Sequence, residues 1–466
     1  MSQRFGLGEA ALPLVTAVVS MGATIVAGST DLYWPLLAGL IVALVLAARK
    51  GFGWSELRAA AVGGVKATWI PVFILILVGC LIGVWKLSGT VPAMVYYGLS
   101  VASPRFLVPT AFVLALTMSM LLGTSVGTYS TLGVAIMGVA HGVGAPLPMV
   151  AGALVSGALF GDRSSPLAGS LNLNVAMTGT DLRKMLPVLA PTGITAAVLT
   201  LVGYLIFGVG PAGDGASAGA GMRAAIAGHF VINPWLLVPP LLVLGLAFMR
   251  VPVKWALGLG IVAGGALSVA VAGTSLLEPV KAALFGYASN AGDPALDKVF
   301  SGGGLFPMWR QFALLWAAGA FSGIMEKTGM MAVVFDRLVE GTRRQLALVG
   351  SAMMVSTGVA LVAANQALPI IITGRMLRPI YDKAGYSPEL LSRSIADSAT
   401  VLSGIIPWNL MALLAAAALG VPVRAFVPFA FFAFLLPVVS LVFAFVEERR
   451  GLAVFARTAA DLTKGD

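Results

Sequence analysis

Long apolar runs separated by short polar connections dominate the hydrophobic pattern of this chain. A helix needs roughly 20 apolar residues to cross the hydrocarbon core of a bilayer. The pattern predicts full spans at 11–28, 33–48, 69–86, 106–123, 186–209, 231–249, 253–273, 311–326, 346–364 and 423–446. Shorter apolar pieces, interrupted by Gly or Pro, lie at 90–102, 124–143, 148–178, 365–377, 387–404 and 406–420. We therefore predict an all-α polytopic membrane protein of about 10–13 transmembrane segments, including broken or re-entrant helices.

Composition supports the same class of protein. The chain is 59% hydrophobic and only 10% charged, whereas a soluble domain is about 25% charged. The net charge of +10 does not indicate a nucleic-acid partner, because the basic residues gather in short connections, as in the cytoplasmic loops of membrane proteins. The 27–32 connection has no Lys or Arg, whereas both 49–66 and the tail after 448 are basic. We expect a multi-pass protein of the bacterial inner membrane with both termini in the cytoplasm.

The segment 156–180 is the most informative break in the apolar pattern. Its apolar run stops at Gly161, and Asp162, Arg163 and a polar stretch with Asn172 and Asn174 follow. Irregular backbone at membrane depth is tolerated only where protein or a water-filled cavity shelters it. Ionisable groups there indicate a functional site. We interpret this break as half of a substrate or ion site in a secondary transporter.

An internal repeat is visible at an offset of about 240 residues. Residues 81–99 align with 320–338, which places Lys86 opposite Glu326, and 161–172 aligns with 396–409. Broken segments at matching places are typical of transporters built from two inverted repeats. The predicted division is 1–68 (N-terminal helices and loop), 69–207 (first repeat), 208–230 (flexible Gly/Ala/Ser-rich linker), 231–310 (connecting helices), 311–420 (second repeat) and 421–466 (last helix and tail).

Four motifs resemble the NhaC family of sodium/proton antiporters, in the order expected for that family. They are LIGVWKLSGTVPAMVYYGL (81–99), GTSVGTYSTLGVAIMG (123–138), FGDRSSPLAGSLNL (160–173) and GRMLRPIYDKAGYSPELLSRSIADSATVLSGIIPWN (374–409). The resemblance implies exchange of sodium or lithium for protons, although relatives exchange carboxylates such as malate and lactate. The family usually has an acid at three positions that are neutral here, namely Gly169, Asn365 and Ala396.

Asp162 and Asp397 are the strongest candidate acids, because each lies at a break. One carboxylate that protons and cations occupy in turn is sufficient for antiport, and backbone and side-chain oxygens at broken helices suit sodium. The predicted cation or substrate ligands are Asp162, Ser165, Asn172, Asn174, Asp397, Ser398, Thr400, Ser403, Asn409, Thr124, Ser125, Thr128, Asn365 and Gln366. The alternative is that the acids pair with Arg163, Arg375 or Arg393 and only hold the fold, and that the hydroxyls serve helix packing.

Other functions stay open at this stage. If the missing acids matter, the arginines become carboxylate ligands, and the protein transports small organic carboxylates or amino acids with sodium or protons. A channel or a membrane scaffold is a third possibility. Lys86 and Glu326 either pair with each other or reach separately to the interface. Gly123 to Gly127 fit GxSxG, but the strand–turn–helix setting of a hydrolase is missing. We expect no enzyme activity, no structural metal and no cofactor, a bilayer partner, and by analogy a homodimer.

Overall fold

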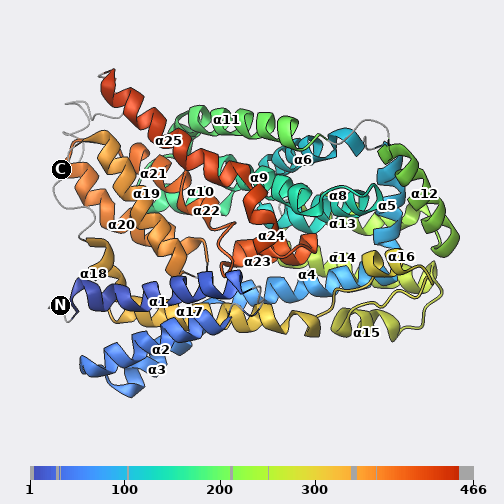
Figure 1. The fold of residues 1–466 in the computed structure, drawn as a ribbon, viewed down its shortest axis with the longest axis horizontal. Helices are drawn as coiled ribbons and strands as arrows, with labels where there is room; N and C mark the ends of the chain where they lie inside the picture. Colours follow the sequence, from blue (N-terminus) through green and yellow to red (C-terminus); the bar gives the residue numbers. More distant parts are fainter. Residues whose placement is uncertain are drawn as a thin grey trace.

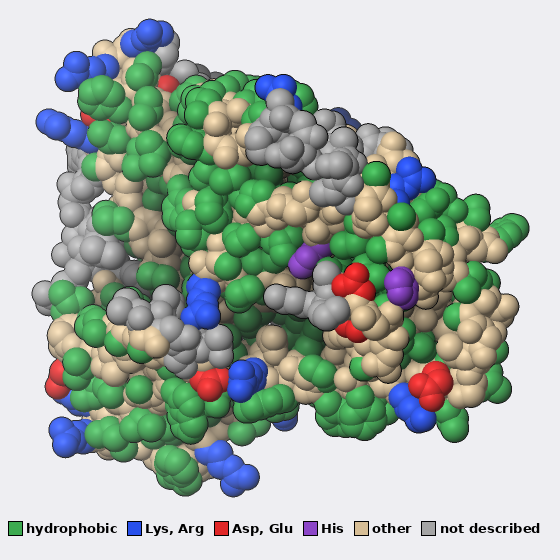
Figure 2. Space-filling view, turned by 45° about the vertical axis from the view of Figure 1, so that its right-hand side comes forward, with side chains coloured by type: hydrophobic (Ala, Val, Ile, Leu, Met, Phe, Trp, Pro, Cys, Tyr) green, Lys and Arg blue, Asp and Glu red, His purple; other side chains and the backbone are tan. Residues whose placement is uncertain are grey.

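The computed structural model describes residues 5–27, 31, 33–101, 104–209, 214–249, 251–336, 344–363 and 365–450. Within these residues the chain is mainly helical and has no named strand, and an isolated antiparallel bridge joins Tyr287 and Gly302 (Figure 1). Six described helices are long and apolar enough to cross a membrane, and up to eight if each bent pair counts as one span. Hydrophobic side chains are the most frequent kind on the face in Figure 2. The protein is an all-α polytopic membrane protein, as predicted.

Three helices precede the first repeat: α1 (Leu7–Val26), α2 (Tyr33–Arg49) and α3 (Trp54–Ala67). The first repeat contains α4 (Trp69–Leu87), α5 (Thr90–Val101), α6 (Leu107–Leu122), α7 (Ser125–Thr128), α8 (Val134–Gly142), α9 (Leu147–Ser164), α10 (Gly169–Thr178) and α11 (Leu182–Phe207). The connection contains α12 (Asp214–His229), α13 (Val238–Phe248), α14 (Val253–Ala270), α15 (Glu278–Phe285) and α16 (Pro294–Phe300). The second repeat contains α17 (Trp309–Lys327), α18 (Met330–Asp336), α19 (Gln345–Val362), α20 (Ala367–Lys383), α21 (Pro388–Ala396), α22 (Ala399–Leu402), α23 (Leu410–Leu419), α24 (Val423–Phe426) and α25 (Phe431–Arg449).

The helices of the two repeats correspond in order and, at several places, in length. α4 and α17 have 19 residues each and begin 240 positions apart, and α10 and α23 have 10 residues each and begin 241 positions apart. α4 and α17 are both followed by a glycine with positive φ, Gly89 (79°) and Gly329 (76°), which allows the sharp turn into the next short helix. α24 and α25 correspond to α11, so the match extends past the predicted boundary at residue 420.

The two repeats run in opposite directions. α3 and α4 form one long apolar span, Trp54–Leu87. α3 is antiparallel to α17, because a Cβ on Gly64 would lie 2.0 Å from the carbonyl oxygen of Gly319, and one on Gly323 would lie 2.4 Å from that of Ala60. α4 therefore runs opposite to α17, and Figure 1 shows α5 at one end of the molecule and α18 at the other. This is the arrangement expected of inverted repeats.

Two sequence predictions about the connections are wrong. The segment 208–222 is not a flexible linker throughout, because α12 covers 214–229. Alanine favours helix, and α12 is held by a buried Ile226 and by Arg223, whose guanidinium lies 4.6 Å from the ring centre of Tyr96. The predicted span 423–446 is also not continuous. A break containing Pro428 separates α24 from α25, because proline lacks the N–H that a helix interior needs.

Candidate functional site

Asp162 lies near the end of α9, and its carboxylate is bound by a single residue, Ser125. The Ser125 N–H donates to Oδ1 at 3.0 Å and its hydroxyl donates to Oδ2 at 2.6 Å. Ser125 is the first residue of α7, where backbone N–H groups have no partner within the helix and favour negative charge. Asp162 is buried and forms no salt bridge within the described part of the chain.

Close helix packing positions this contact. α6 ends at Gly123, whose positive φ (66°) turns the chain, and Thr124 then caps α7 by accepting the N–H of Gly127 at 3.3 Å. α9 packs directly on α6, since a Cβ on Gly161 would lie only 2.0 Å from the Ser119 hydroxyl. The glycine thus allows the approach that places Asp162 beside the start of α7.

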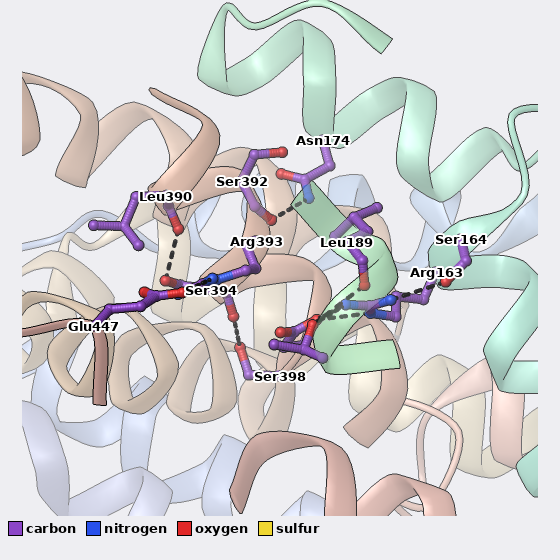
Figure 3. A network of polar contacts seen from close by, with 12 residues as sticks. Arg163, Ser164, Asn174, Leu189, Leu390, Ser392, Arg393, Ser394, Ser398 and Glu447 are labelled. Carbon is purple, nitrogen blue, oxygen red and sulfur yellow. Dashed lines mark hydrogen bonds and ion pairs between the residues drawn. The ribbon is translucent and has the colours of Figure 1, made fainter. Parts of the chain in front are cut away.

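Arg163, the next residue of α9, connects the two repeats (Figure 3). Its Nε donates to Oδ1 of Asp397 at 2.6 Å, and both side chains are fully buried. The guanidinium also donates to the hydroxyls of Thr192 (2.6 Å) and Ser164 (2.9 Å). Asp397 lies in the break between α21 and α22, and its second oxygen has no hydrogen-bond partner among the described residues. The pairing considered in the sequence analysis therefore applies to Asp397 but not to Asp162.

Arg393 of α21 also forms an ion pair with an acidic residue of the chain. Its two Nη atoms donate to the two carboxylate oxygens of Glu447 on α25, each at 2.9 Å, and Gln345 donates to the same carboxylate at 2.6 Å. Sequence reasoning missed Glu447. The available signal was an acid at the end of an apolar helix, but its distance of 54 positions from Arg393 gives no indication of the pairing.

Several predicted ligands surround the Arg163–Asp397 pair. Asn174 of α10 donates to the Ser392 carbonyl at 2.8 Å. Ser398 shares a hydrogen bond of 2.6 Å with Ser356 of α19. The Thr400 carbonyl accepts from Gln366 at 2.7 Å. The structure therefore places Asn174, Ser398, Thr400 and Gln366 in hydrogen bonds with residues of or near the α21–α22 break.

The caps of the two repeats match, but the acids do not. Asn365 accepts the N–H of Leu368 at 3.0 Å, as Thr124 accepts that of Gly127, and both pairs are 241 positions apart. α9 and α21 begin 241 positions apart as well. In this register Asp162 corresponds to Ser403, and the sequence alignment of Asp162 with Asp397 is wrong by six positions.

Other predicted residues have local or remote roles. Asn409 caps α23, Ser403 and Thr128 donate to the carbonyl four residues earlier, and Ser165 donates to Met120. Asn172 is exposed and donates to nearby carbonyls.

Three charged residues are not where the sequence analysis expected them. Arg375 and Glu326 are exposed, and neither forms a salt bridge in the described part of the chain. Lys86 donates to the carbonyls of Val299 and Ser301, so of the two alternatives left open for Lys86 and Glu326, pairing with each other is excluded. The reason is that α4 and α17, which carry the two residues, run in opposite directions.

A cavity of about 410 Å³ lies next to the Asp162 region. Its lining includes Thr124, Gly127, Thr131 and Asn172 from the first repeat, together with apolar residues of α13 and α14. A Cβ on Gly169, a position where the resemblance described above implies an acid, would meet nothing within 4 Å. This cavity therefore lies beside the first residues of α7 and the α9–α10 connection, next to the contact between Asp162 and Ser125.

Comparison with known proteins gives the relationship of the chain. The family model described as "Na+/H+ antiporter family" matches residues 7–209 and 157–447. The chain is 34% identical to the Na(+)/H(+) antiporter NhaC of Bacillus subtilis, over 89% of this chain and 92% of that protein. It is 30% identical to the arginine/ornithine antiporter ArcD of Halobacterium salinarum (95% and 92%) and 28% identical to a malate-2H(+)/Na(+)-lactate antiporter of Bacillus subtilis (88% and 88%). The chain belongs to the Na+/H+ antiporter family.

Proposed function

We propose that this protein exchanges sodium or lithium for protons by alternating access, and that Asp162 is the group that the cation and the proton occupy in turn. The observation behind the proposal is the difference between the two buried acids. Asp397 is already neutralised by Arg163, whereas Asp162 is bound only by the N–H and hydroxyl of Ser125.

A buried carboxylate without a cationic partner is costly, because it loses its hydration without gaining an opposite charge. A proton or a sodium ion at Asp162 removes that cost, and the two cannot occupy the carboxylate together. The same group therefore couples the two fluxes. The Ser125 hydroxyl can turn its oxygen toward a bound cation, since a hydroxyl both donates and accepts.

Arg163 has a different role in this scheme. It holds the end of α9 against the break in the opposite repeat, so the α9–α10 and α21–α22 segments move as one unit. Alternating access in inverted-repeat transporters is largely movement of one such unit against the remaining helices. Asp397 acts as a positioning residue for this unit, and the proposal does not use it as a cation ligand.

The test uses full-length protein in proteoliposomes with a pH-sensitive dye, to which sodium, lithium and potassium chloride are added in turn. Wild type moves protons on addition of sodium or lithium. Asp162→Asn brings that flux to background with normal insertion, and Glu278→Gln, an exposed acid on α15, keeps it. Retained sodium-dependent flux in Asp162→Asn removes this residue from the mechanism.

Exchange of organic carboxylates or amino acids is the second candidate, supported by the similarity to the arginine/ornithine and malate/lactate antiporters. The structure weakens one form of it, since internal carboxylates already bind both buried guanidiniums, Arg163 and Arg393. The same vesicles distinguish the two. The second candidate is favoured if no cation causes proton flux but lactate, malate or an amino acid does.

The remaining parts of the proposal concern the setting. We place this multi-pass protein in the bacterial inner membrane with both termini in the cytoplasm, as a transporter without enzymatic activity or bound cofactor. In support, α1 begins and α25 ends at the same end of the molecule in Figure 1, and Lys50 at the end of α2 pairs with Glu9 there. A homodimer is proposed by analogy with other transporters, and we propose no nucleic-acid partner.

A further inference from the structure

A second cavity, separate from the Asp162 region, contains a partly buried cation, Lys86, that the proposed exchange does not use. It has a volume of about 290 Å³ and lies between α4, α8, the end of α23 and the loop 299–304. Lys86 and His141 line it, with Ser301, Gly302 and Gly303. None of the described lining residues is an Asp or Glu.

The Lys86 ammonium is fixed by neutral groups. It donates to the carbonyl oxygens of Val299 (3.1 Å) and Ser301 (2.5 Å) and forms no salt bridge within the described residues. An ammonium has three N–H donors, so these two bonds leave one for a ligand. Burying a charge is costly unless it is paired, and a carbonyl dipole compensates it less than an opposite charge does.

Backbone contacts hold one wall of this cavity against α4. Gly302, Gly303 and Gly304 all have positive φ (114°, 80° and 90°), and the Gly304 N–H donates to the Gly79 carbonyl of α4 at 2.7 Å. A Cβ on Gly303 would lie 2.3 Å from the backbone nitrogen of Gly83, so loop and helix are in backbone contact. The binding geometry is therefore present before any ligand arrives.

We propose that this cavity binds a small monovalent anion, chloride or a short monocarboxylate, on the Lys86 ammonium. The anion supplies the negative charge that none of the described lining residues provides. The volume suits an ion or a molecule of a few heavy atoms. This site is distinct from Asp162, and the proposal does not depend on sodium/proton exchange.

The test measures binding of radiolabelled chloride and radiolabelled acetate to the purified full-length protein, at fixed sodium concentration and with gluconate balancing the ionic strength. Wild type is expected to bind at least one of the two saturably. Lys86→Gln weakens that affinity at least tenfold, whereas Lys86→Arg retains most of it by keeping the charge. Lys281→Gln, an exposed lysine on α15, serves as the matched control and binds as wild type does.

Each outcome decides the proposal. Tighter binding of chloride or of acetate identifies whether the ligand of the cavity is a halide ion or a short monocarboxylate. Absence of saturable binding of either to wild type overturns the proposal, and so does unchanged binding to Lys86→Gln. If Lys86→Gln does not fold, competition decides instead, because lactate must displace the label from wild type and from Lys86→Arg. Asp162→Asn is expected to lose sodium-dependent flux and keep anion binding, so the two proposals fail separately.

Discussion

Breaking the Arg163–Asp397 pair is expected to destabilise the protein more than any surface charge change. Arg163→Met leaves Asp397 buried, charged and without its partner, and it also removes the hydrogen bond to Thr192. Removal of one partner of a buried ion pair costs about 3–5 kcal/mol, because the remaining charge is uncompensated. Asp397→Leu is expected to cost a similar amount for the same reason.

The double variant Arg163→Met/Asp397→Leu gives the sharper result. With both charges removed, no uncompensated charge remains, and replacement of a buried pair by apolar groups is often neutral or stabilising. The double variant should therefore be more stable than either single variant. The coupling free energy should be at least about 3–5 kcal/mol, and about 6–10 kcal/mol if the double variant is as stable as wild type.

The assay is reversible unfolding in mixed micelles, followed by tryptophan fluorescence as the denaturing detergent is increased. The matched control is the exposed pair Lys281–Glu278 (63% and 43% exposed), for which single changes should cost no more than about 1 kcal/mol. Costs below about 1 kcal/mol for Arg163→Met, or strictly additive costs in the double variant, would refute the reasoning.

Three further predictions follow from single positions. The N–H of Ala291 donates to the carboxylate of Asp297 and holds the pKa of that carboxyl below its usual range. The stability that this contact adds to the folded state is therefore present above the ordinary Asp pKa and is lost as pH falls through the lowered pKa. The Asp297→Asn variant should therefore lose less thermal stability than wild type between pH 7 and 3, and equal losses contradict this. Gly64→Ala should destabilise by about 1–3 kcal/mol, because its Cβ overlaps a carbonyl oxygen of α17. Gly63→Ala should not destabilise the protein, because its Cβ would meet nothing within 4 Å. Equal detergent-unfolding midpoints for the two variants would refute the close contact between Gly64 and α17. Gly169→Asp should fold normally, since its Cβ meets nothing within 4 Å, and should lower the half-saturating sodium concentration for flux. An unchanged value shows that this position does not reach the cation.

Sequence patterns indicated where the polar interruptions near the candidate site lie. The break after Gly161 is visible because a polar, charged stretch interrupts an apolar run, and the structure places Asp162 in a buried contact there. Thr124 and Asn365, which the sequence predicted as cation or substrate ligands, both cap helices in the structure, a common role for hydroxyl and amide side chains. These features depend on neighbouring residues, which a sequence displays directly.

Partner choice could not be predicted in the same way. Arg163 could have paired with either acid, and it pairs with Asp397, 234 positions away. Lys86 and Glu326 look equivalent in an alignment, but the antiparallel directions of α4 and α17 separate them. Pairing depends on which helix faces meet, and that depends on packing across the whole molecule.

The sequence by itself therefore determined the class of protein and the polar interruptions of its apolar runs, but not every helix end, since Pro428 divides a span predicted as continuous. Apolar runs must be helical in a bilayer, since every backbone polar group needs an internal partner, and this constraint acts within each segment. Only the tertiary structure decided that Asp397 is neutralised, that Asp162 has no cationic partner, and that Glu447 holds Arg393. The physical reason is that a buried charge is compensated by whatever packing brings within hydrogen-bond distance, independent of separation along the chain.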